Sequence, residues 1–107
     1  MEAEHDMKAL YIVANAGHAD EIMEIMRAAG APGGTILHAR GKGSSHQLVM
    51  GITLDYEREI IISVVDNVTA GRIMDELKEK AGWNTEVHGV CYTMPVERMI
   101  GLRKDGT

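Results

Sequence analysis

The chain has 107 residues, 45% of them hydrophobic, and a formal net charge of −5 at pH 7, which fits one globular domain. An acidic balance without a basic stripe argues against a nucleic-acid binder, and no apolar run reaches the roughly 18 residues of a membrane helix. With one Trp, three Tyr, no Phe and eight Met, the core must be filled by Met and Ile. The lone Cys91 forms no internal disulfide, so we expect a cytoplasmic protein.

Residues 1–7 are expected to be a disordered leader. The short apolar run LYIVA at residues 10–14 predicts a buried strand. From His18 the period changes to that of a helix, and one face is formed by Ile22, Ile25, Met26 and Ala29. Gly30 ends this helix and Pro32 prevents its continuation.

Five glycines and a proline bracket a second apolar run, in the segment GAPGGTILHARGKG at residues 30–43. We interpret it as a turn, a strand at residues 35–39 and a glycine-hinged loop that leaves the sheet. An ordinary hairpin with a loose connection is the alternative. Residues 48–54 are apolar again, broken by Gly51, and residues 55–58 predict a polar bend. We expect the charged residues 57–59 to be a solvated part of that bend.

The strongest strand signal is IIISVV at residues 60–65, which indicates burial on both faces. Asn67 or Thr69 can cap the helix that follows, and Glu76 and Lys80 can pair on its wet side. Gly82 ends that helix, residues 83–89 form a loop, and residues 90–94 a last strand before Pro95. The helix has one apolar stripe, made of Ala70, Ile73, Met74, Leu77 and Ala81.

The resulting order, βαββαβ, predicts an α+β ferredoxin-like sandwich, with two helices on one face of a four-stranded antiparallel sheet. We expect a single domain over residues 1–107, with a flexible regulatory loop at residues 41–54 and a tail at residues 103–107. The other sheet face needs a cover, and strands apolar on both sides imply that another subunit supplies it. A monomer with a partly wet sheet is the alternative.

No catalytic motif is present, and we expect the protein not to be an enzyme. Cys91 lies in an apolar strand, where a thiol is usually inert. The five histidines share no metal-ligand spacing; His38 and His88 could meet in the fold, but solvent-facing imidazoles are favoured. Arg40 and Lys42, in a glycine-rich segment, could attract an anion.

Two stretches resemble the P-II signalling proteins. Residues 30–35 and 40–43 are similar to that family's Gly-x-x-Gly-x-Thr and Lys-Gly-x-Gly segments, and residues 89–97 and 100–103 to its C-terminal ending. The resemblance covers about residues 8–103. It implies a homotrimer in which an adenine nucleotide (ATP, ADP or AMP) binds between subunits, and a long loop that then docks on a target protein such as a membrane transporter.

Carried over to this chain, the resemblance gives two sets of residues. The nucleotide-binding set is Thr35, Arg40, Gly41, Gly43, Gly89 and Arg103. The partner-binding loop contains Lys42, Ser44, Ser45, His46 and Gln47. Val90 stands where the family has a phosphate-binding lysine, and Gly101 replaces the first of two arginines. Because each lost charge-assisted hydrogen bond is worth about 1.5–3 kcal/mol, we expect weaker ATP binding than is usual in the family.

The preferred hypothesis is therefore a cytosolic P-II-like regulator that senses a small anionic metabolite without inserting into a membrane. The rival is a trimer resembling the CutA-type proteins that binds a divalent metal through His38, His46 or His88. A small enzyme of the same fold ranks third, since no nucleophile with a partner is visible. The sequence leaves open whether a metal accompanies the nucleotide.

Overall fold

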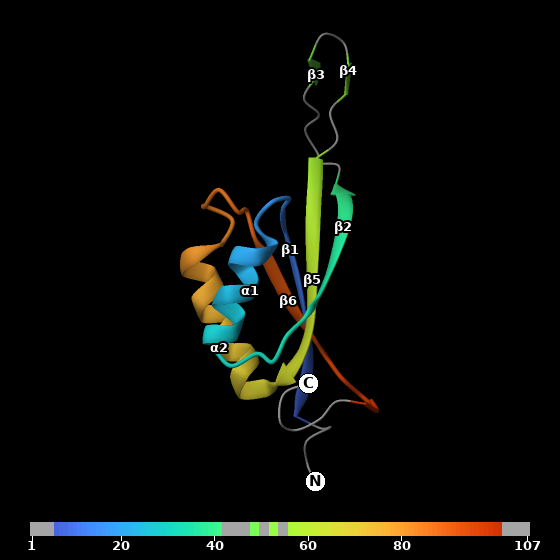
Figure 1. Cartoon of the computed structure of the whole chain (residues 1–107), viewed down its shortest axis with the longest axis vertical. Helices are drawn as coiled ribbons and strands as arrows, with labels where there is room; N and C mark the ends of the chain where they lie inside the picture. The colour runs from blue at the N-terminus through green and yellow to red at the C-terminus, as the bar shows by residue number, and fades with distance from the viewer. Residues whose placement is uncertain (1–5, 42–47, 50–51, 54–55, 102–107) are drawn as a thin grey trace.

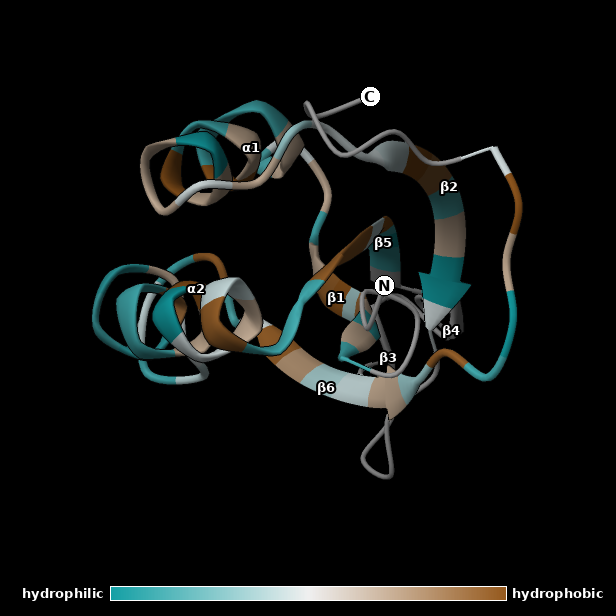
Figure 2. Cartoon of the chain, turned by 90° about the horizontal axis from the view of Figure 1, so that it is seen from below, coloured by the Kyte–Doolittle hydropathy of each residue, from teal (hydrophilic) through white to brown (hydrophobic). Residues whose placement is uncertain are grey.

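The computed structural model describes residues 6–41, 48–49, 52–53 and 56–101. One antiparallel sheet carries four strands in the order β2-β5-β1-β6: β2 (Thr35–Gly41), β5 (Tyr56–Asp66), β1 (Met7–Asn15) and β6 (Val90–Pro95). Helices α1 (Ala19–Ala28) and α2 (Asn67–Lys80) lie side by side on one face (Figures 1 and 2). The predicted ferredoxin-like α+β fold is confirmed.

The core lies between the helices and the sheet. Alternate residues of the two central strands point into it, among them Leu10 and Ile12 from β1 and Ile61 from β5. Helix α1 buries Ile22, Met23 and Met26. Helix α2 buries most of the predicted stripe, while Met74 is only partly buried. No helix in the described part of the chain is long and apolar enough to cross a membrane.

The opposite sheet face is apolar and only partly covered. Leu37 is 44% exposed, Tyr92 48% and Met94 42%, and the strand registers place them on the face away from the helices, with Ile60 and Ile62. Tyr11 and Tyr92 stack there in parallel, with ring centroids 5.7 Å apart. The single chain therefore exposes the surface that the sequence predicts another subunit to cover.

Strand β5 corrects the predicted bend. It runs for 11 residues from Tyr56, so Glu57, Arg58 and Glu59 belong to a strand and not to a solvated turn. Arg58 pairs with Asn15 and Ala39, and Glu59 with Ala14 and His38, in the same ladders that continue into the apolar run. Asp55 lies outside the described residues. The charges did not end the strand because the register supplies partners on both sides.

Two strand boundaries and the predicted loop also differ from expectation. Met7, predicted to belong to the leader, begins β1 and is buried, while residues 1–5 lie outside the described residues. Strand β2 extends through Arg40 and Gly41, so the predicted loop at residues 41–54 begins one residue later. Within it, β3 (Leu48–Val49) pairs with β4 (Ile52–Thr53), beyond the end of the sheet (Figure 1). The rest of that loop lies outside the described residues.

The cap of α2 is Asp66, not Asn67 or Thr69. Its carboxylate accepts a hydrogen bond of 2.7 Å from the backbone N–H of Thr69. This bond, more than any other contact, lowers the pKa of Asp66 below its ordinary 3.8; further hydrogen bonds from Thr69 and Val68 and the charge of Arg72 act in the same direction. Asp66 thus ends the strand and starts the helix.

Replacing Asp66 with Ala should lower the free energy of unfolding by about 0.5–2 kcal/mol at pH 7, because the cap is lost. Since the folded pKa lies below 3.8, the contribution of the cap is complete above that pH and is lost as the pH falls through the folded value. Urea denaturation of wild type and Asp66→Ala, at one fixed protein concentration and a series of pH values, measures both effects.

The matched control is Asp75→Ala, which removes the same charge from an exposed position in the middle of α2. It should leave stability within about 0.5 kcal/mol of wild type. Equal effects of the two substitutions would show that Asp66 does not act as a cap.

Candidate functional site

The buried carboxylate of Glu59 organises the end of the sheet from which the chain leaves β2. Glu59 is 8% exposed, and its Oε1 accepts hydrogen bonds from the backbone N–H groups of Gly17 (2.9 Å) and Ala19 (3.1 Å). Ala19 is the first residue of α1 and its N–H has no acceptor within the helix, while Gly17 lies two residues before the helix; a negative charge is favoured at this helix start. The other oxygen lies 3.7 Å from Nδ1 of His38 on β2. One side chain thus connects β5, α1 and β2.

Asn15, the last residue of β1, makes a second set of contacts next to Glu59, since its partner across the ladder is Arg58. Its backbone N–H donates to the carbonyl of Val87 (2.9 Å) and its side-chain Nδ2 to the carbonyl of Glu86 (3.0 Å). Its Oδ1 accepts from the guanidinium of Arg58. Because residues 86 and 87 belong to the 83–89 loop, Asn15 ties that loop to β5. Sequence reasoning missed Asn15, Arg58 and Glu59 as a group.

The 83–89 loop is held from several sides. The N–H of Gly89 donates to the carbonyl of Ala81 (2.8 Å), and an added Cβ at Gly89 would lie 2.3 Å from that oxygen. No side chain fits there, so the close packing of the backbone requires glycine at position 89, whether or not a ligand binds. Val87 is buried in the core. Trp83 remains 59% exposed and makes an edge contact with His88, whose backbone lies in the left-handed region (φ 51°).

The structure brings together only part of the predicted nucleotide-binding set. Arg40 and Gly41 are neighbours at the end of β2, while Thr35 begins that strand six residues away, about 20 Å along it. Gly89 precedes β6 at the same end of the sheet as Arg40, but on the opposite edge, about three strand spacings or 14 Å across. Gly43, Arg103 and the partner-loop residues 42 and 44–47 lie outside the described residues.

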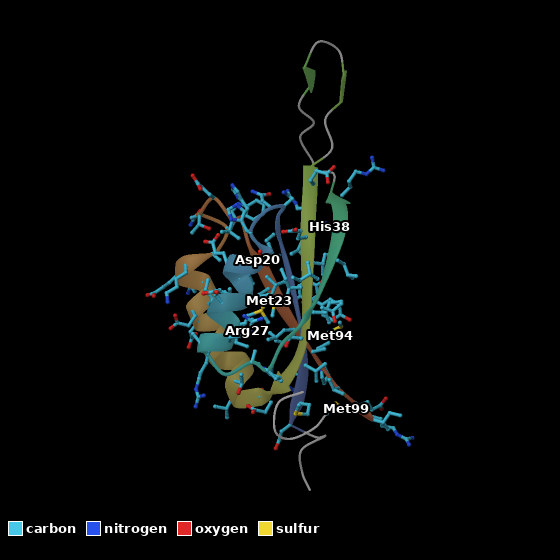
Figure 3. The ribbon with its side chains drawn as sticks, in the orientation of Figure 1. Asp20, Met23, Arg27, His38, Met94 and Met99 are labelled. Atoms are coloured by element: carbon cyan, nitrogen blue, oxygen red, sulfur yellow. The ribbon has the colours of Figure 1, made fainter. Side chains whose placement is uncertain are left out.

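The histidines and the cysteine have ordinary surroundings. His38, labelled in Figure 3, lies near Glu59 and its side chain is 82% exposed, while His88 contacts Trp83. Each of these histidines thus has a neighbour other than the other histidine. Over residues 6–41 and 56–101 no three His, Cys, Asp or Glu side chains gather as metal ligands, and His46 is not described. Burial raises the pKa of the Cys91 thiol to about 11.

Comparison with protein-family models matches residues 7–106 to the family described as nitrogen regulatory protein P-II. Comparison with curated protein sequences gives no match.

Solved structures agree in fold. A PII-like signalling protein from Thermus thermophilus is 26% identical, with a TM-score of 0.64 over 82% of this chain and 83% of its own. The protein CPII from Thiomonas intermedia, solved with ADP and bicarbonate, is 25% identical, with a TM-score of 0.62 over 82% and 83%. GlnK of B. subtilis is 18% identical and shares the fold, with a TM-score of 0.66 over 92% of each chain.

Replacing Glu59 with Ala should lower the free energy of unfolding by about 1–3 kcal/mol, because the N–H of Ala19 is left buried without an acceptor. Glu59→Gln keeps one acceptor oxygen and should cost less. Urea denaturation measures the difference. The control is Glu57→Ala, two residues earlier on the same side of β5 but exposed; if it were as destabilising as Glu59→Ala, the two hydrogen bonds could not be the cause.

Cys91 should react slowly with a disulfide reagent in the native protein. With a pKa of about 11, about one thiol in a thousand is ionised at pH 8. The native rate should rise about tenfold per pH unit as the pH approaches that value. Absorbance assays with and without urea give the comparison, and a native rate equal to the unfolded rate would contradict the burial.

Proposed function

Since this chain belongs to the nitrogen regulatory protein P-II family, we propose that it is a non-enzymatic regulator that binds an adenine nucleotide between subunits of a homotrimer. Binding would control a target protein such as a membrane transporter. CPII, at 25% identity, was solved with ADP and bicarbonate, which makes ADP the first ligand to test. We place the protein in the cytosol, consistent with its unpaired cysteine.

One geometric observation carries the proposal. The two best-defined parts of the predicted site, Arg40 with Gly41 and the loop ending at Gly89, lie at the same end of the sheet but on opposite edge strands. A ligand that contacts both Arg40 and the 83–89 loop would therefore bind most easily at a boundary between chains. There the β2 edge of one subunit faces another subunit. The exposed apolar sheet face supports such assembly, because packing it against copies of itself removes Leu37, Tyr92 and Met94 from water.

The nucleotide would be recognised by charge and by backbone groups. Arg40 supplies a guanidinium for a phosphate, and Gly41 lets the ligand approach the backbone closely. Gly43, Arg103 and Thr35 would complete the set, with Thr35 acting from the far end of β2. Val90, an apolar residue at the position of the family's lysine, supports a preference for ADP or AMP over ATP, because fewer cations are left for a third phosphate.

Control of the partner would follow from the same site. Residues 42–47, which include Lys42, Ser44, Ser45, His46 and Gln47, directly follow Arg40 and Gly41 in the chain. A ligand held at Arg40 would favour one arrangement of that segment over others and so change its affinity for a target.

ADP should bind with one site per chain in a titration calorimeter, and Arg40→Ala should weaken binding about 10- to 100-fold, the equivalent of one charge-assisted hydrogen bond. The matched control is Arg27→Ala, which removes the same charge from the exposed side of α1 and should leave binding unchanged. Trp83, the only tryptophan, lies in the 83–89 loop, so its fluorescence gives a second signal.

Two results would count against the proposal. One is the absence of heat and of any fluorescence change with ADP, AMP and ATP at millimolar concentration. The other is a stable, soluble monomer by sedimentation at micromolar concentration, since a single chain would leave the site incomplete.

A further inference from the structure

Asn15 uses its backbone N–H and both polar groups of its side chain at one junction. Its two donors hold the carbonyls of Glu86 and Val87, consecutive residues of the 83–89 loop, and its acceptor receives the Arg58 guanidinium. Arg58 is also its register partner in the central ladder. The side chain therefore bridges two segments that are adjacent in neither sequence nor sheet order.

The loop end of this bridge is firmly held. The N–H of Gly89 and the carbonyl of Ala81 fix the loop to the end of α2, Val87 is buried in the core, and Thr85 bonds back to Gly82. These contacts place Gly89 in the same hydrogen-bonded loop as Glu86 and Val87, the two residues that Asn15 contacts.

The strand end of the bridge lies where β5 begins. Arg58 is the third residue of β5, and the next residue, Glu59, holds the start of α1 and lies near His38 of β2. Two consecutive residues of β5 thus make different contacts. Arg58 reaches the 83–89 loop through Asn15 on one face of the sheet, and Glu59 contacts the start of α1 on the other face.

We propose that Asn15 is a positioning residue that couples the 83–89 loop to the start of β5, so that a nucleotide bound against the loop alters the hydrogen bonding of β5. The inference rests on the proposed function. It adds a route by which ligand binding could reach the partner loop. Asn15 contacts both the 83–89 loop, which would bind the ligand, and β5, the strand that follows the predicted partner loop.

The experiment is hydrogen exchange of the backbone amides of residues 57–59, with and without ADP, in wild type and Asn15→Ala. The substitution keeps the backbone bond to Val87 and removes only the two side-chain links. Wild type should show an ADP-induced change in exchange, and Asn15→Ala should lose most of it while its calorimetric Kd for ADP changes by less than about fivefold. A purely structural role would lower the melting temperature but leave the ADP-induced change intact.

Two further variants sharpen the result. Asn15→Asp keeps the acceptor for Arg58 but has no donor for the carbonyl of Glu86, so it should lose the response even if the alanine variant folds poorly. Asn84→Ala, at an exposed loop residue with no hydrogen bond to another described residue, should keep it.

The outcomes separate the two proposals. If ADP binds wild type but leaves residues 57–59 unchanged, or changes them equally in the Asn15 variants, the coupling is wrong and the proposed function stands. If calorimetry detects no ADP binding to wild type, the proposed function fails and the coupling fails with it.

Discussion

The antiparallel pairing of β1 with β5 is the constraint on which the other elements depend. It runs over nine residue pairs, from Met7 with Asp66 to Asn15 with Arg58. Its register decides which side chains enter the core, because shifting one of the two strands by one residue would turn its core-facing side chains to the other face of the sheet. The same register brings Glu59 to the start of α1 and Arg58 to Asn15, so the core and the candidate site are fixed by one set of hydrogen bonds.

The order of elements could be predicted because each core element has its own local pattern. The apolar runs at residues 10–14 and 60–65 and the two helical stripes are visible within a few residues of sequence. The charged start of β5 could not be predicted in the same way. The sequence of Glu57, Arg58 and Glu59 is typical of a turn. Glu59 is accommodated in a buried strand because it accepts hydrogen bonds from Gly17 and Ala19, about 40 residues away in the chain. Only the fold brings such partners together, and a local window cannot contain them.

The residues of the candidate site also fall into those that a local sequence pattern indicates and those that only the fold brings together. The glycine-rich segment around β2 and Gly89 were chosen as site residues from spacing and from the resemblance to the P-II family, and they stay predictions. Asn15 gave no signal, because an asparagine before Ala-Gly is typical of any turn. The cap of α2 was misplaced for a related reason: Asp66, Asn67 and Thr69 are all good capping residues, and only the geometry selects Asp66.

The close approach of Gly89 to the carbonyl of Ala81 has a consequence for how this protein can change over evolution. The 83–89 loop takes its shape from the last turn of α2, so neither can be exchanged alone. A chimera that imports this loop from a homologue would have to import the end of the helix as well, and the two should be inherited as one module.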